Sequence, residues 1–111
     1  MPRKQRKYLY DILEAATSIE EYLGDRRDFK DYLANKQLRR AVERELEIIG
    51  EATNRLLSLQ PDFPLADARR IVNLRNWVIH GYDKVDSGLI WGIVSKDLPK
   101  LKTHVQELLR S

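Results

Sequence analysis

An arginine and a histidine stand five positions apart in the stretch from Arg75 to Tyr82. An arginine side chain stays charged and can grip an anionic group with two parallel hydrogen bonds. Histidine has an unperturbed pKa of about 6.5, which suits it to transferring protons near neutral pH. Arg75 and His80 are therefore candidates for a site that binds an anion and moves a proton.

The stretch before His80 predicts a helix over Leu65–Ile79, but with a charge in its apolar face. At about 100° per residue, one arc carries Ala68, Ile71, Val72, Val78 and Ile79, with Arg75 in its middle. A guanidinium in that place needs an anionic partner or an anionic ligand. Gly81 is the residue type favoured just past a helix end, which would let His80 turn towards Arg75. Alternatively, Arg75 meets His80 from a second copy of the chain.

Helical periodicity recurs in three other stretches. Apolar residues follow one another at three- and four-residue steps over Tyr8–Leu23, Lys36–Leu59 and Leu89–Leu109. Gly24 ends the first of these stretches. Pro99 lacks a backbone donor and clashes with the preceding turn, so the last helix is predicted to be kinked or split around Lys96–Pro99. Glu45 lies in the apolar stripe of the second stretch, and we expect it to pair with Arg75.

The connections between these helices are short and carry turn residues. Phe29, Tyr32 and Leu33 predict one short helical turn before Asn35. Breakers occupy Pro61–Pro64, and Asp86 is a good N-cap for the last helix. Nothing alternates with period two over a useful length. The sequence therefore predicts an all-α fold, an up-and-down four-helix bundle with a short extra helical turn and a Pro-kinked or split last helix.

Composition narrows the class of protein. A chain of 111 residues that is 42% hydrophobic and 33% charged is expected to form one domain over residues 1–111. It has no cysteine and only two histidines, so we expect no metal site and no cofactor. We expect no membrane span and no signal peptide, and hence a cytoplasmic location.

The positive charge of the chain has two interpretations. A net charge of +3 permits nucleic-acid binding without establishing it. Four of the cations lie in the first seven residues, at Arg3, Lys4, Arg6 and Lys7. They form either a solvated tail or a contact to phosphate.

Three segments together resemble one known family. Arg75 to Tyr82 fits the pattern of HEPN domains, in which an arginine is followed after four to six residues by histidine, here with Asn76 next to the arginine and Tyr82 two residues after His80. The segment from Ala41 to Ala52 resembles the long helix of the HepT-like branch of that family. The segments from Val85 to Trp91 and from Asp97 to Leu101 resemble it too, so the similarity extends over nearly the whole chain.

The resemblance implies a fold, an activity and partners. HepT-like proteins are small helical ribonuclease toxins that form homodimers, with both active sites at the dimer cleft. Each is usually encoded beside a minimal nucleotidyltransferase antitoxin of the MntA type. By this resemblance Arg75 and His80 become the catalytic pair, Asn76 the polar residue that supports it, and Tyr82 the tyrosine that the antitoxin adenylylates.

The residue types suit cleavage of RNA without a metal ion. RNA carries its own nucleophile in the 2′-hydroxyl, so cleavage needs proton transfers and a cation on the developing phosphorane charge. His80 and Arg75 fit these two tasks. The expected products are a 2′,3′-cyclic phosphate and a free 5′-hydroxyl.

Two alternative functions, a binding module and a structural protein, remain open. In one, a non-catalytic HEPN module binds a nucleotide or presents a substrate surface to a nucleotidyltransferase, with Arg75 as a phosphate clamp. In the other, the chain is a purely structural dimeric bundle, with His80 capping a helix end. Trp77 and Trp91 are read as packing or interface residues, and His104 as a surface residue.

Overall fold

A computed structural model describes residues 1–25, 27–65, 70, 72–73 and 86–110 of the chain. Throughout this part, every regular element is helical, which confirms the all-α prediction. The elements are α1 (Arg3–Leu23), α2 (Phe29–Ala34), α3 (Lys36–Leu59), α5 (Ser87–Gly92), the π-helical turn η1 (Ile93–Asp97) and α6 (Leu98–Arg110).

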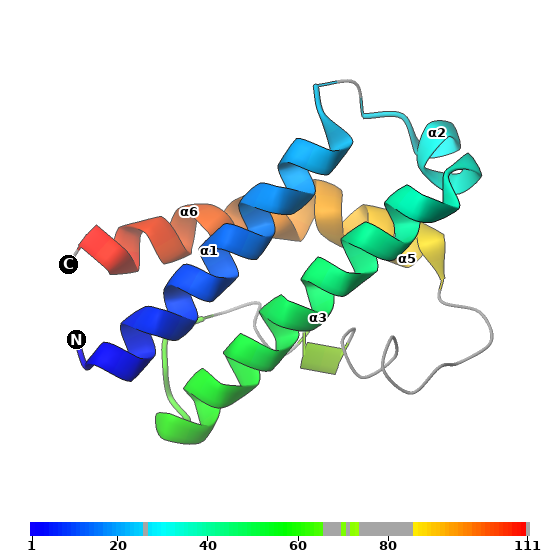
Figure 1. The fold of residues 1–111 in the computed structure, drawn as a ribbon. Coiled ribbons are helices and arrows are strands. Elements are labelled where there is room, and N and C mark those ends of the chain that lie inside the picture. The colour runs from blue at the N-terminus through cyan, green and yellow to red at the C-terminus, as the bar shows by residue number, and fades with distance from the viewer. Residues whose placement is uncertain (26, 66–69, 71, 74–85, 111) are drawn as a thin grey trace.

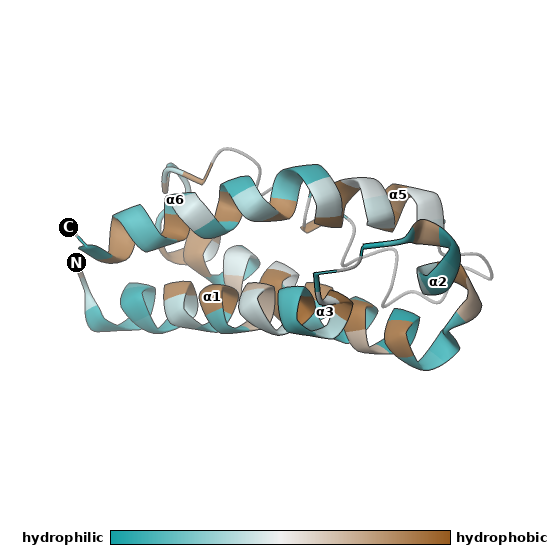
Figure 2. Ribbon diagram, turned by 90° about the horizontal axis from the view of Figure 1, so that it is seen from above, coloured by the Kyte–Doolittle hydropathy of each residue, from teal (hydrophilic) through white to brown (hydrophobic). Residues whose placement is uncertain are grey.

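The helices form two layers. Helices α1 and α3 run antiparallel side by side, and α5, η1 and α6 follow one another across their inner face (Figure 1). The view from above shows this second layer separately, with apolar residues turned towards the first (Figure 2). Helix α1 packs most extensively on α3 and next on α6. The start of α1 and the end of α6 lie at the same end of the bundle (Figure 1).

Helix α1 supplies the centre of the core. Its buried apolar residues, which lie within the predicted stretch Tyr8–Leu23, are Leu9, Ile12, Ala15, Ala16 and Ile19. Helix α3 contributes the buried apolar residues Val42, Leu46, Ile49, Ala52 and Leu56. Leu59 was predicted to continue this stripe, but it is the last residue of the helix and is half exposed. The stripe therefore ends one turn earlier than predicted.

Side chains and one glycine set the helix ends. Gly24 takes a φ of 66° and its N–H donates to the carbonyl of Glu20 at 3.0 Å, which closes α1. The Asp28 carboxylate accepts from the backbone N–H of Lys30 at 2.8 Å and begins α2, the short helical turn that the sequence predicts. Asn35 accepts from the backbone N–H of Leu38 at 3.0 Å and begins α3. Hydrogen bonds between residues close in sequence thus determine where α1 ends and where α2 and α3 begin.

The last helix departs from α-helical geometry at Ile93–Asp97, which begins one turn before the predicted interruption at Lys96–Pro99, and it does so as a widened turn. In η1 the backbone N–H of Leu98 bonds to the carbonyl of Ile93, five residues earlier, directly before Pro99. A proline ring in a regular helix clashes with the carbonyl four residues before it. Widening the helix just ahead of the proline gives that ring room, so the chain continues into α6.

Replacing Gly24, which follows the end of α1, and Gly92, which has helical dihedral angles, should change the free energy of unfolding in opposite directions. Gly24→Ala should lower the free energy of unfolding by about 1–3 kcal/mol, because a Cβ is strained at this backbone conformation. Gly92→Ala should raise it by about 0.5–1 kcal/mol, because Gly92 has helical dihedral angles and no described atom lies within 4 Å of the added Cβ. Urea unfolding of the two variants beside the parent chain measures both. An equal effect of the two substitutions would contradict this account of Gly24.

Candidate functional site

The four residues that the sequence singles out lie outside the described part of the chain. Arg75, Asn76, His80 and Tyr82 all fall within residues 74–85, and so does Trp77. Their roles therefore remain predictions. The structure does describe the chain on both sides of this segment and the groups that hold those flanks.

The flank that precedes the segment is anchored in the core. After α3 ends, the backbone N–H of Phe63 donates to the carbonyl of Gln60 at 3.0 Å. Phe63 and Leu65 are both buried. Further along, Arg70, Val72 and Asn73 are helical, in agreement with the predicted helix; its other residues from 66 onwards lie outside the described part.

The flank that follows the segment is fixed by a capped helix. The Asp86 carboxylate accepts from the backbone N–H groups of Gly88 at 2.9 Å and Leu89 at 3.1 Å, which confirms Asp86 as the predicted N-cap of α5. Ile90 is buried. The next residue, Trp91, stacks at a tilt on Tyr32, with ring centroids 5.3 Å apart. Trp91 is thus a packing residue, as the sequence suggests.

Tyr32 packs in this aromatic contact with its hydroxyl buried. Burial raises the pKa of Tyr32 to about 12, because the phenolate would lose its hydration. Tyr32 therefore stays neutral at physiological pH and acts as an apolar ring that joins α2 to α5.

An ion pair joins the flank that precedes the segment to the last helix. Nη1 of Arg70 lies 3.5 Å from Oδ2 of Asp97, the last residue of η1. Sequence reasoning missed this pair. One signal was available, since Asp97 is the sole acidic residue between Asp86 and Glu107. The pairing itself could not be read from the sequence, because the partners are far apart along the chain.

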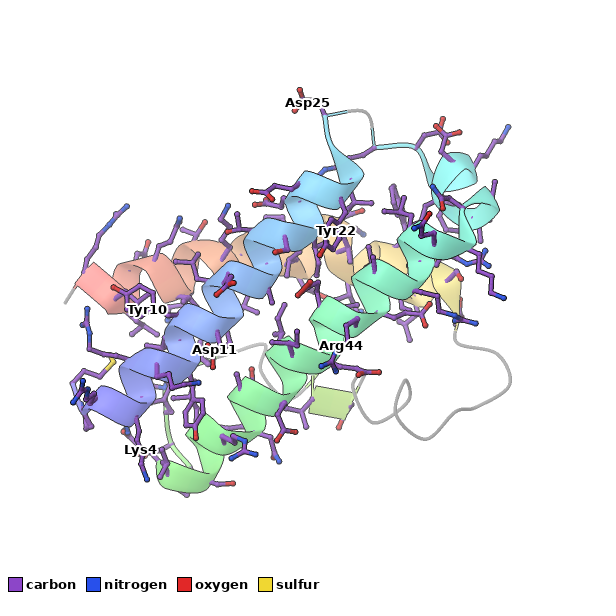
Figure 3. The ribbon with its side chains drawn as sticks, viewed as in Figure 1. Lys4, Tyr10, Asp11, Tyr22, Asp25 and Arg44 are labelled. Atoms are coloured by element: carbon purple, nitrogen blue, oxygen red, sulfur yellow. The ribbon has the colours of Figure 1, made fainter. Side chains whose placement is uncertain are left out.

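Glu45 has a described partner on α1. The hydroxyl of Tyr22 donates to its Oε2 at 2.9 Å, and this hydrogen bond raises the pKa of Tyr22. Tyr22 projects from α1 on the side of α3 (Figure 3). Because Arg75 lies outside the described residues, the Glu45–Arg75 pair stays a prediction. The deeply buried acid of α3 is instead Glu43, which pairs with Arg40 at 3.0 Å.

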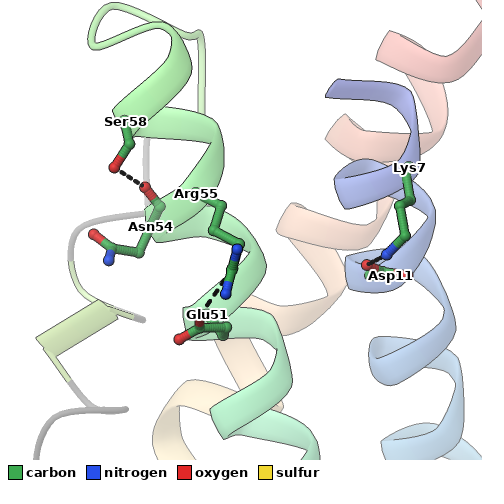
Figure 4. A network of polar contacts seen from close by, with 6 residues as sticks. All are labelled: Lys7, Asp11, Glu51, Asn54, Arg55 and Ser58. Atoms are coloured by element: carbon green, nitrogen blue, oxygen red, sulfur yellow. Dashed lines mark hydrogen bonds and ion pairs between the residues drawn. The ribbon is translucent and has the colours of Figure 1, made fainter. Parts of the chain in front are cut away.

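The groove between α1 and α3 has a volume of about 410 Å³ and carries balanced charge. Each of its three cations pairs with an acid on its own helix: Lys7 with Asp11 at 2.9 Å, Arg44 with Glu47 at 3.0 Å, and Arg55 with Glu51 at 2.9 Å. Figure 4 shows the first and last of these pairs. The groove is therefore a poor site for an anion such as RNA.

Two further residues that the sequence analysis names, Arg6 and His104, lie in the described part of the chain. Nη1 of Arg6 donates to the carbonyl of Leu109 at 3.4 Å and so satisfies a free carbonyl at the end of α6. His104 is half-buried on α6, beside Lys100 and Glu107. It is a surface-facing histidine, as predicted.

Two searches of the described residues bear on the class of site. Over this part of the chain, no group of three or more His, Cys, Asp or Glu side chains could hold a metal ion. No described helix is long and apolar enough to cross a membrane.

Comparison with known proteins gives a full-length match. The family described as "Ribonuclease HepT-like" matches residues 12–108. The chain is 41% identical over 105 residues to the protein named "Putative RNase MJ1380" of Methanocaldococcus jannaschii, a match that spans 94% of this chain and 95% of that protein. It is 38% identical over 112 residues to "Probable ribonuclease HepT" of Thermococcus cleftensis, spanning 97% and 98% of the two chains. No solved structure matches the chain.

Proposed function

Because this chain belongs to the HepT-like ribonuclease family, we propose that it is an endoribonuclease that cuts RNA without a metal ion. The observation that carries the proposal is the family match over residues 12–108, which includes both Arg75 and His80. Relatives of the same length are named as ribonucleases. The flanks of the segment support it, because both are held by the bundle.

The proposed reaction is an attack by RNA on itself. The 2′-hydroxyl gives up its proton and its oxygen bonds to the adjacent phosphorus. The bond from phosphorus to the 5′-oxygen breaks, and that oxygen takes up a proton. His80 transfers protons, Arg75 stabilises the charge on the phosphorane, and Asn76 supports the pair. The products are a 2′,3′-cyclic phosphate and a 5′-hydroxyl.

We also propose that the working form is a homodimer with both motif segments at one cleft. A single histidine must otherwise both remove and return a proton, and a two-fold dimer brings two copies of it together. Sedimentation at micromolar concentration checks this, because a dimer has twice the 13.1 kDa mass of one chain. A monomer at that concentration would exclude it.

A nucleotidyltransferase antitoxin is the proposed partner that controls the activity. Attaching AMP to Tyr82, two residues after His80, would place a bulky anion close to Arg75 in sequence. The anion would compete for the guanidinium and repel RNA phosphates. In this proposal the chain is a toxin that is stored folded and silenced.

The first prediction of this proposal concerns the two histidines. His80→Ala and Arg75→Ala should each lower RNA cleavage about a hundredfold or more, since groups that stabilise a transition state are commonly worth that much. His104→Ala is the matched control, because His104 lies on α6 with no proposed role, and it should cleave like the parent. Circular dichroism verifies that all three are folded. Full activity in His80→Ala refutes the assignment, and RNA binding without cleavage by the parent supports the non-catalytic module instead.

The second prediction concerns Tyr82. With the partner nucleotidyltransferase and ATP, the parent chain should gain the mass of AMP on Tyr82 and lose RNA cleavage. Tyr82→Phe should stay active and unlabelled, while Tyr10→Phe, which removes an exposed tyrosine of α1, should still be labelled and silenced. Peptide mass mapping locates the label. Silencing of Tyr82→Phe would place control at another residue.

A further inference from the structure

Asp97 is the last residue of η1, a turn whose buried residues, Ile93 and Val94, are apolar. Its side chain is only 15% exposed, and its Oδ2 is buried with no hydrogen-bond donor among the described residues. In η1 the backbone N–H of Leu98 bonds to the carbonyl of Ile93, and both side chains are buried. Asp97 therefore lies at the edge of the buried face of the last helix, where a carboxylate is costly unless it meets a cation.

The cation that it meets is Arg70, in the flank that precedes the segment of residues 74–85. Nη1 of Arg70 lies 3.5 Å from the buried Oδ2. Arg70 is itself 59% exposed, and it lies in a helical stretch five residues before Arg75. The Arg70–Asp97 pair thus joins the end of η1 to a residue that lies only five positions before Arg75 in the sequence.

The position of the carboxylate is set by rigid neighbours. Pro99 follows it by two residues, and the widened turn that accommodates the proline fixes the direction of the helix at Asp97. Leu98 and Leu101 hold the following turn in the core. The acid is therefore the fixed partner, and the more exposed arginine is the group that it holds.

We propose that Asp97 is a positioning residue for RNA cleavage, which it serves by holding Arg70 and so the stretch that carries Arg75. This inference rests on the proposed function. Asp97 touches no substrate in this account. Its loss should lower turnover by letting the catalytic groups shift, since a displacement of about 1 Å can cost roughly a hundredfold in rate.

The chain offers a matched control for this pair. Nζ of Lys102 lies 2.5 Å from Oε1 of Glu20 and joins α6 to α1. Both pairs join the last helix to another element, but the Glu20 pair does not reach the motif segment. Removing one charge from each pair therefore separates positioning of the motif from general stability.

The test is steady-state RNA cleavage by Asp97→Asn, Arg70→Met, the double variant and Glu20→Gln. We expect about a tenfold or larger loss of kcat in each Arg70 and Asp97 variant, with little change in KM and in the pH profile. The double variant should lose no more than either single one, because the two groups act as one unit. Glu20→Gln should keep the parent kcat, and Arg70→Lys should recover part of the loss.

Several outcomes would overturn the inference. These are parent kcat in Asp97→Asn, multiplied losses in the double variant, or an equal loss in Glu20→Gln. An altered pH profile in Asp97→Asn would make Asp97 a catalytic group instead. If Asp97→Asn does not fold, the Arg70 variants decide, because that side chain is largely exposed.

A parent chain that does not cleave RNA refutes the proposed function. Hydrogen exchange then tests separately whether the Arg70–Asp97 ion pair, here called the tether, holds the stretch that follows Arg70. Faster exchange of the peptide spanning residues 70–85 in Asp97→Asn, with α1 and α3 unchanged, supports the tether. Unchanged exchange overturns it.

Discussion

The antiparallel packing of α1 on α3 is the contact on which the described structure depends. Both helices bring an apolar stripe to it, and Leu9, Ile12, Leu46 and Ile49 are fully buried. Fully burying a side chain of this size is worth about 1.5–3 kcal/mol. The charged residues that border the contact are paired along their own helices, so they add little to it. Apolar burial is therefore what holds the first layer, and the last helix packs on it.

The last helix must meet two structural requirements at once. It must cover the core with Ile90, Ile93 and Leu98, and it must pass Pro99 without a break. The widened turn η1 satisfies both, since it clears the proline ring while Ile93 and Leu98 stay buried. It also leaves Asp97 at the edge of the buried face, beside Arg70. The turn that accommodates Pro99 thus places the Asp97 carboxylate beside Arg70, shortly before the segment of the candidate site.

Much of the fold could be predicted because its signals are local. Gly24, Asn35 and Asp86 end or begin helices by contacts within a few residues, and α3 has the predicted bounds Lys36–Leu59. The form of the interruption before Pro99 was not predictable, because a kink, a split and a widened turn all relieve the same clash.

Features that depend on tertiary packing were harder to predict. Helical spacing placed Glu45 in the stripe of α3, yet Glu43 is the deeply buried acid, since neighbouring helices decide which side of the stripe is covered. The Arg70–Asp97 pair joins distant parts of the chain, and although Asp97 is conspicuous as a lone acid, no local spacing identifies Arg70 as its partner. The roles of Arg75 and His80 came from the family resemblance, because an arginine and a histidine at this spacing also suit a helix end with no catalytic role.

The chemical ends of the cleaved RNA test the central claim most directly. Purified protein should be incubated with RNA in EDTA and the termini of the fragments identified by mass spectrometry. Attack by the 2′-hydroxyl predicts a 2′,3′-cyclic phosphate on one fragment and a 5′-hydroxyl on the other, at a rate that EDTA does not change. Fragments that carry a 3′-hydroxyl and a 5′-phosphate, or activity that is lost in EDTA and restored by a divalent cation, would contradict it.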